Sequence, residues 1–199
     1  MELKDYFEDY NDVLQQTLAD ELNQEGLNQA VDWIRQTKNL KTKIILIGNG
    51  GSAAIAEHMA TDLTKNAGLR AMTLSGTPIL TTFANDFGYQ HIYSKAVEAY
   101  ADRGDILVAI SSGGTSPNIL NAVDAAKEMG CRVITFSGFD AKNLLRQKGD
   151  INIYVPSFAY GYVELIHNLL IHFINDKIIG GAVYPAKRAG QPSGSKVKR

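Results

Sequence analysis

Two glycine- and hydroxyl-rich segments, each directly after an apolar run, constrain the fold of this chain most. The segment 48–52 (GNGGS) follows the apolar run 43–47, and the segment 111–116 (SSGGTS) follows the run 105–110. Both precede helical patterns. A glycine turn between a parallel strand and a helix presents backbone N–H groups at the positive end of that helix, where an anion is stabilised. Two such turns predict a polar, phosphorylated small molecule held between them.

The rest of the chain alternates strand and helix patterns. Residues 3–22 and a second stretch carrying Leu27, Val31 and Ile34 have apolar side chains at helical spacing. The expected strands are 43–47, 70–74, 105–110, 131–136 and 151–155, and the expected helices are 52–65, 89–101, 117–129 and 160–179. Ser116-Pro117 is predicted to be an N-cap followed by proline at the first helical position. The pattern predicts an α/β fold with a five-stranded parallel sheet between helices and an N-terminal helical extension.

Composition bounds the class of protein. The 199 residues predict a single domain over 1–181, followed by a disordered basic tail over 182–199. A net charge of −1 gives no general attraction to nucleic acid or to an anionic membrane. No apolar run approaches the roughly 18 residues of a membrane span, and the start lacks a signal-peptide pattern, so we expect a cytoplasmic protein. The single cysteine, Cys131, excludes a disulfide framework and is expected in the core.

In an open parallel sheet, ligands bind beyond the carboxyl ends of the strands, where both glycine segments are expected. The alternative is that each is only a tight turn. The second segment is the stronger candidate for a phosphate site, because Ser111, Ser112, Thr115 and Ser116 all carry hydroxyls. It lacks the Gly-Lys-Ser/Thr ending of a nucleotide P-loop, and the first segment lacks the Gly-x-Gly-x-x-Gly spacing of a dinucleotide site.

Four side chains have the spacing of a metal site. His58 and Asp62 are four residues apart on one predicted helix, and Glu164 and His172 are eight apart on the last. If these helices meet at the carboxyl edge of the sheet, the four could bind zinc or another first-row divalent ion. The alternative is an ordinary surface pair. His167, five residues before His172, is expected to point elsewhere.

Three segments resemble a known family: 48–63 (GNGGSAAIAEHMATDL), 84–89 (ANDFGY) and 104–118 (GDILVAISSGGTSPN). They are similar to the sugar isomerase (SIS) domain and, within it, to the phosphoheptose isomerases. The resemblance implies a flavodoxin-like sandwich, a homotetramer with active sites at subunit contacts, and isomerisation of sedoheptulose 7-phosphate to D-glycero-D-manno-heptose 7-phosphate for bacterial surface heptose.

The resemblance also implies residue roles. The residues expected to bind the substrate phosphate are Ser111, Ser112, Thr115 and Ser116. Those expected to bind the sugar are Asn49, Gly50, Gly51, Ser52 and Glu164, with Asp86 nearby. The expected ligands of zinc, one ion per subunit, are His58, Asp62, Glu164 and His172, and Asp62 and His172 are also expected to transfer protons.

The chain departs from the family at three positions. Asp62 stands where the family usually has glutamate, Glu164-Leu165 stands for glutamine-glutamate, and Gly113 replaces a serine. Two alternatives therefore stay open: an isomerase of another phosphorylated sugar, and a non-catalytic SIS scaffold or regulator. The chain retains a carboxylate at position 62 and a histidine at position 172, which favours a catalytic protein over a non-catalytic scaffold.

The first helix bears on oligomeric state. Its apolar side chains exceed what a solvent-facing helix needs, which predicts that it contributes to the homotetramer contacts. The alternative is that the same face packs only on its own sheet. The residues concerned are Tyr6, Phe7, Tyr10, Leu14 and Leu18.

Overall fold

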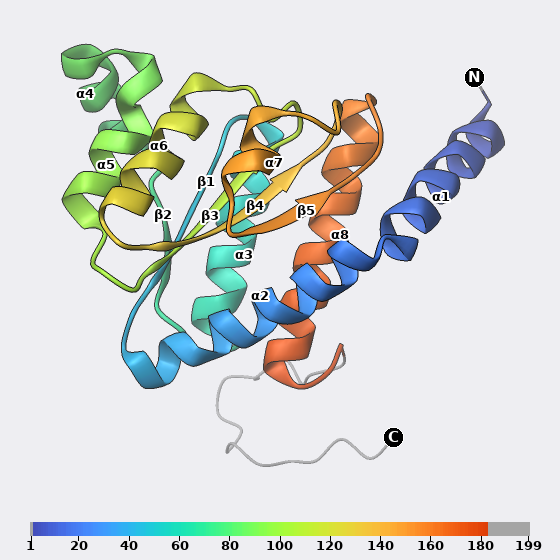
Figure 1. Ribbon diagram of the computed structural model, residues 1–199, viewed down its shortest axis with the longest axis horizontal. Helices are drawn as coiled ribbons and strands as arrows, with labels where there is room; N and C mark the ends of the chain where they lie inside the picture. The colour runs from blue at the N-terminus through green and yellow to red at the C-terminus, as the bar shows by residue number, and fades with distance from the viewer. Residues whose placement is uncertain (1, 183–199) are drawn as a thin grey trace, which may run out of the picture.

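The computed structural model describes residues 2–182. Two long helices, α1 (Leu3–Ala19) and α2 (Glu21–Leu40), precede a parallel sheet that has helices on both faces (Figure 1). The other elements are β1 (Ile44–Gly48), α3 (Gly51–Lys65), β2 (Ala71–Thr73), α4 (Thr77–Phe87), the 3-10 helix η1 (Tyr89–His91), α5 (Ile92–Tyr100), β3 (Ile106–Ser111), α6 (Pro117–Glu128), β4 (Arg132–Ser137), α7 (Leu144–Lys148), β5 (Ile151–Tyr154) and α8 (Tyr160–Ile179).

The sheet has the strand order β2-β1-β3-β4-β5, and every neighbouring pair is parallel. The chain leaves β1 on one side to form β2 and then returns to the other side to form β3. The topological switch point therefore lies between β1 and β3, whose carboxyl ends carry the segments 48–52 and 111–116. This is the position at which open parallel sheets bind ligands.

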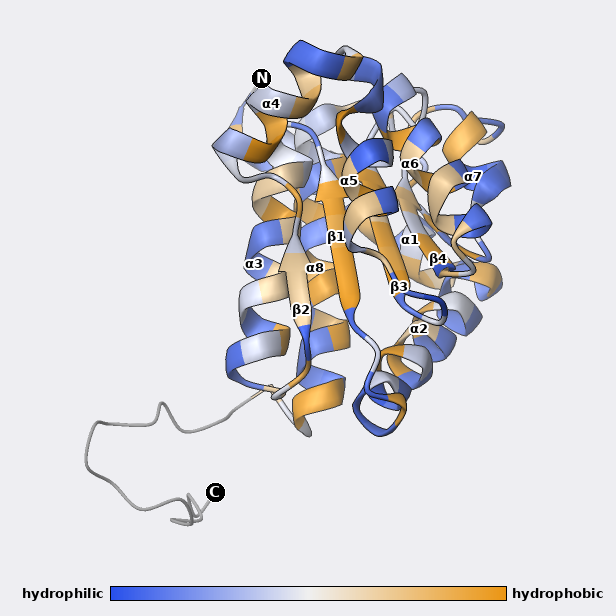
Figure 2. Cartoon of the chain, turned by 90° about the vertical axis from the view of Figure 1, so that its left-hand side faces the viewer, coloured by the Kyte–Doolittle hydropathy of each residue, from blue (hydrophilic) through white to orange (hydrophobic). Residues whose placement is uncertain are grey.

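The strands separate two apolar cores. Ile44 and Leu46 of β1 point to the face covered by α2, α3 and α8, whereas Ile45 and Ile47 point to the face covered by α5 and α6. Figure 2 shows the apolar strands between helices that turn their polar sides outward. Burial on both faces explains why the central strands are apolar throughout, as a covered parallel sheet requires.

The predicted fold class and all five strands are confirmed, with shifts of at most one residue at their ends. Two local predictions are wrong. The stretch 3–22 is interrupted at Asp20, whose side chain caps α2 by accepting a hydrogen bond from the Asn23 backbone N–H at 3.1 Å. The helix expected over 89–101 starts only at Ile92, after η1. The predicted N-cap Ser116 and the proline at the first position of α6 are confirmed, although the Ser116 side chain makes no capping hydrogen bond.

Two helices were not predicted, α4 and α7. The five residues of α7 are too few for a periodic pattern. Helix α4 is rich in threonine, which has a low helix propensity, and none of its residues is buried.

The burial of Cys131 confirms its predicted place in the core, and burial raises the pKa of its thiol to about 11. No helix among residues 2–182 is long and apolar enough to cross a membrane. The domain boundary at 181 stays a prediction, and the predicted disordered tail lies, from residue 183 on, outside the described residues.

Candidate functional site

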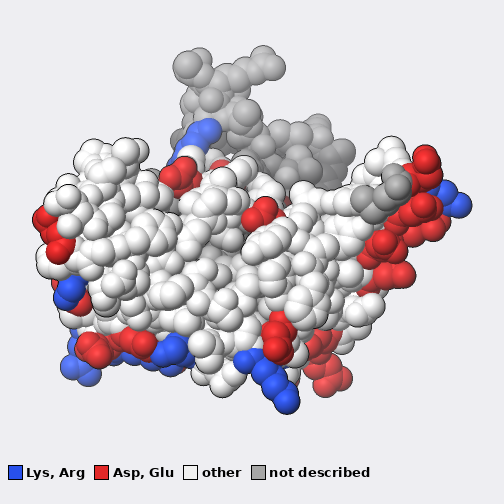
Figure 3. Space-filling view, turned by 90° about the horizontal axis from the view of Figure 1, so that it is seen from above, with Lys and Arg blue, Asp and Glu red and all other residues white. Residues whose placement is uncertain are grey.

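Both glycine segments lie at the carboxyl edge of the sheet, as predicted. Seen from above, on the side where the strands end, the molecule carries most Lys and Arg side chains at its rim, and the centre of the face is largely uncharged (Figure 3). An anion bound here would therefore depend on hydroxyl and backbone N–H donors rather than on cationic side chains.

The second segment, 111–116, has free donors in the right place. The Ser112 hydroxyl is buried, with 4% of the residue exposed, and has no hydrogen-bond partner among the described residues. A buried hydroxyl without a partner is costly, which favours a ligand or water that completes it. The Ser116 hydroxyl is also free of a capping role, and α6 contributes the unpaired N–H groups of its first turn.

Asn143 holds this segment from the neighbouring loop. Gly114 has a φ of +63°, and a Cβ there would lie 2.1 Å from the Asn143 Oδ1 atom, so only glycine fits. The Asn143 amide also donates to the Ser137 hydroxyl at 3.1 Å and caps α7 by accepting from the Arg146 N–H at 2.9 Å. The loops that follow β3 and β4 therefore support each other.

The first segment, 48–52, is closed by the last helix. A Cβ on Gly51 would lie 2.5 Å from Glu164 Oε2 and 2.6 Å from Oε1, so the carboxylate occupies the space that glycine leaves free. No hydrogen bond or ion pair within residues 2–182 engages this carboxylate. Glu164 thus presents a free acceptor beside the N-terminus of α3, and Ser52 lies buried in the first turn of that helix.

Three of the four predicted metal ligands come together. One ligand atom from each of His58, Asp62 and His172 lies within 4.8 Å of the others. His58 Nε2 is 3.3 Å from Asp62 Oδ2, and the two imidazole centroids are 4.8 Å apart. The Asn66 amide donates to Asp62 Oδ1 at 3.0 Å, which orients the carboxylate. We call these three side chains the His/Asp/His group.

Glu164 is not part of this group. Helices α3 and α8 start at the same edge of the sheet, and His172 lies eight residues, about 12 Å, further along α8 than Glu164. The group therefore sits midway along the two helices and not at the mouth between the glycine segments, as the four-residue arrangement required. Its nitrogen and oxygen donors still suit zinc, and three ligands with an open position are typical of catalytic zinc sites.

His167 points away from the group, as predicted. It is fully buried, and its Nε2 atom lies 3.1 Å from the Ser137 carbonyl oxygen at the end of β4. Burial lowers its pKa to about 4, so the ring is neutral near pH 7. Its role is to anchor α8 on the sheet.

The sequence did not reveal the polar contacts that fix the first segment. Asn49 exchanges two hydrogen bonds with Asn118 on α6, and Tyr93 donates its hydroxyl to the Gly48 carbonyl oxygen at 2.5 Å. In the sequence, the only indication of these contacts is that Asn118 is a polar residue in the first turn of a predicted helix. Asp86, predicted near the sugar, is exposed on α4 and accepts a hydrogen bond from the Asn85 amide, and within residues 2–182 it makes no hydrogen bond or ion pair with either segment.

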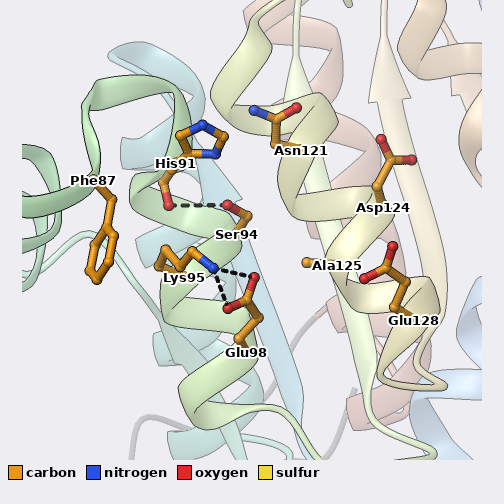
Figure 4. Close-up of a pocket in the computed structure, with 9 residues that line it drawn as sticks. All are labelled: Phe87, His91, Ser94, Lys95, Glu98, Asn121, Asp124, Ala125 and Glu128. Carbon is orange, nitrogen blue, oxygen red and sulfur yellow. Dashed lines mark hydrogen bonds and ion pairs between the residues drawn. The ribbon is translucent and has the colours of Figure 1, made fainter.

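A groove of about 330 Å³ lies elsewhere, between α5 and α6. Figure 4 shows that Lys95 bonds both carboxylate oxygens of Glu98, at 3.0 and 2.7 Å. Asn121 donates to the Gln90 carbonyl oxygen at 2.9 Å. Because Lys95 and Asn121 already have partners and the other charged groups of the lining, Asp124 and Glu128, are acidic, the edge of the sheet is the better candidate site for a phosphate.

Comparison with known proteins points the same way. The SIS domain family model matches residues 5–138. The chain is 37% identical to a phosphoheptose isomerase of Helicobacter pylori, over 78% of this chain and 83% of that protein. It is 38% identical to one of Aliarcobacter butzleri, over 80% and 88%. The solved structure of a phosphoheptose isomerase from Neisseria gonorrhoeae has a TM-score of 0.82 and 34% identity, covering 89% of this chain and 97% of that one.

Proposed function

The chain belongs to the phosphoheptose isomerase family of SIS-domain proteins, and on that premise we propose that it interconverts sedoheptulose 7-phosphate and D-glycero-D-manno-heptose 7-phosphate in heptose biosynthesis. It is an aldose–ketose isomerase of a sugar phosphate. The observation that carries this function is the hydroxyl-rich turn at the switch point, with the buried, unpartnered Ser112 hydroxyl at the N-terminal end of α6.

The substrate phosphate binds at Ser111, Ser112, Thr115 and Ser116, where hydroxyls and N–H groups replace cationic side chains. The sugar lies along Gly50, Gly51 and Ser52, with Asn49 contributing at most one side-chain donor. The Glu164 carboxylate, free beside Gly51, accepts a hydrogen bond from a sugar hydroxyl. Asp86 completes the sugar site only if a substrate or a neighbouring subunit draws it in.

The reaction moves one proton between adjacent carbons. A base removes a proton from C1 of the ketose while an acid protonates the C2 carbonyl oxygen, which gives an enediol. Return of a proton to C2 and loss of the O1 proton gives the aldose, so no oxidant or reductant is consumed. Asp62 and His172 are the proposed acid and base. Because both also belong to the proposed zinc site, and a ligand bound to the ion is not a free base, one of them has to be released from the ion while the substrate is bound. Their assignment to the two roles is left to pH–rate profiles of variants at each position.

A divalent ion, which we propose is zinc, fits the His/Asp/His group. When bound, it would supply a Lewis acid for the substrate oxygens. The imidazole nitrogens and the Asp62 carboxylate are the ligand types that zinc prefers, and Asn66 holds the carboxylate from behind. Glu164 stays free for the sugar in this assignment.

We also propose a homotetramer in which a second copy completes each active site. Tyr10 and Leu14 of α1 pack against the chain's own apolar core, whereas Phe7 is 52% and Leu18 39% exposed, which leaves apolar surface on α1 for a partner. On α8, the exposed Leu165, Leu169 and Phe173 flank His172. Apolar side chains around a polar site support a partner that covers them. Light scattering that gives a monomer at micromolar concentration contradicts this proposal.

A second candidate, an isomerase of a different sugar phosphate, is favoured by one observation. The Glu164 carboxylate stands where the family usually has an amide, and a carboxylate accepts but cannot donate hydrogen bonds. It therefore selects for hydroxyl or amine donors at that position of the sugar. Comparing sedoheptulose 7-phosphate with five- and six-carbon ketose phosphates separates the two candidates.

The test of function is direct. Purified protein is incubated with sedoheptulose 7-phosphate and aldose formation is followed. We expect turnover that Ser112→Ala weakens through the Michaelis constant, by about 10-fold for a lost hydrogen bond to a charged group. Ser94→Ala, a buried serine on α5 away from both segments, is the matched control. Absence of turnover with any sugar phosphate contradicts the proposal and favours a scaffold or regulator.

A further inference from the structure

A reciprocal pair of amides joins the first glycine segment to α6, the helix that follows the second segment. Asn49 Nδ2 donates to Asn118 Oδ1 at 3.0 Å, and Asn118 Nδ2 donates to Asn49 Oδ1 at 2.8 Å. Asn49 belongs to the first segment, and Asn118 is the second residue of α6, directly after the second segment. Asn118 is 2% exposed and Asn49 is half-buried, so the contact is partly shielded from water. The amide pair therefore ties the sugar end of the site to the helix that holds the phosphate end.

A count of its hydrogen bonds shows how many donors and acceptors of the Asn49 amide remain for a substrate. An amide offers two N–H donors and two acceptor positions on its oxygen. The Asn49 oxygen accepts from Asn118 and from the Tyr89 hydroxyl, at 3.3 Å, which fills both positions. Its nitrogen gives one N–H to Asn118. A substrate oxygen can therefore receive a single N–H from this side chain, in a direction that Asn118 fixes.

We infer that Asn118 is a positioning residue of the isomerase site, which acts through Asn49 to keep the first segment in shape while phosphate binds at the second. The inference rests on the proposed isomerase function. Without the Asn118 amide, the Asn49 side chain loses one donor and one acceptor partner and can rotate about its own bonds. Catalysis at the sugar end is then affected, whereas the phosphate site keeps its own hydroxyls.

The kinetic test is a double-mutant cycle with Asn49→Ala, Asn118→Ala and the double variant. We expect Asn118→Ala to lower kcat about 10- to 100-fold, since small misplacements of a positioned group have effects of this size. The inhibition constant of inorganic phosphate should change less than twofold. In the Asn49→Ala background, Asn118→Ala should have almost no further effect, because its target is absent.

Two further variants sharpen the cycle. Asn118→Asp can accept a hydrogen bond from Asn49 Nδ2 but cannot donate one to the Asn49 oxygen. We therefore expect its kcat to lie between those of the wild type and of Asn118→Ala. Asn121→Ala is the matched control: it removes the same amide from the next turn of α6, where the side chain points to the groove between α5 and α6 (Figure 4). Its kinetics should equal those of wild type.

A second readout does not depend on activity. Hydrogen–deuterium exchange of the peptide covering 48–53 should become several-fold faster in Asn118→Ala and stay unchanged in Asn121→Ala. If the wild type proves to lack isomerase activity, the proposed function fails and exchange alone decides the inference. Unchanged exchange, or kinetic effects that simply multiply in the double variant, overturns it.

Discussion

The buried ring of His167 should make the stability of this protein depend on pH in a predictable way. Burial lowers its pKa from 6.5 to about 4 in the folded state, whereas the unfolded chain keeps the ordinary value. Between these values the unfolded state binds more protons than the folded state, so stability falls as the pH falls. The full difference corresponds to about 3 kcal/mol at about 1.4 kcal/mol per pKa unit, and about 1 kcal/mol of it is lost by pH 5.5.

The assay compares urea unfolding at pH 7.5 and 5.5, at fixed protein concentration and with a chelator present, so that assembly and metal binding do not contribute. His167→Gln keeps a donor for the Ser137 carbonyl oxygen but does not ionise. We expect the wild type to lose about 1 kcal/mol more than this variant between the two pH values. His91→Gln, at a partly exposed position on η1, is the control and should behave as wild type.

Equal losses in the wild type and in His167→Gln would refute the reasoning. Should the variant fail to fold, an NMR titration of the wild type gives the same information. The His167 ring should stay unprotonated down to about pH 5, and protonation near pH 6.5 in the folded protein would show that burial does not control this group.

Three other predictions follow from single contacts. Gly51→Ala should keep the thermal midpoint, because the obstructing atoms are the mobile end of the Glu164 side chain. It should lower activity as much as Glu164→Ala does, with no further loss in the double variant; additive losses would show that the two positions act separately. Asn66→Ala should weaken zinc binding about 10-fold in calorimetry, through Asp62, and unchanged affinity would exclude Asp62 as a ligand. With its pKa raised to about 11, Cys131 should react with a thiol reagent at pH 8 about 100-fold more slowly in the native protein than in urea, and equal rates would contradict its burial.

The sequence was informative wherever the physics is local or periodic. Apolar runs such as 43–47 and 105–110 must be covered on both faces, and their alternation with helical patterns leaves a parallel sheet as the natural solution. The failures are local as well. Asp20 ends one helix by capping the next, a choice that the apolar spacing across 3–22 does not record. The short α7 depends on Asn143, whose contacts come from residues on the neighbouring strand and loop.

The site was harder to predict because its geometry depends on how two helices align along their axes. The spacing of Glu164 and His172 predicts that both lie on one side of α8. A helical wheel, however, does not show how far apart two residues lie along the helix axis. With α3 and α8 starting at the same edge, each residue of α8 meets the residue of α3 at its own level: Glu164 meets Gly51, and His172 meets His58. Glu164 therefore lies at the level of the first segment, and His172 lies about 12 Å further along α8, in the His/Asp/His group. The variants at Glu164 and Asn66 test these two levels separately, because the Glu164 variant should change sugar selection without changing metal affinity, whereas the Asn66 variant should weaken metal binding.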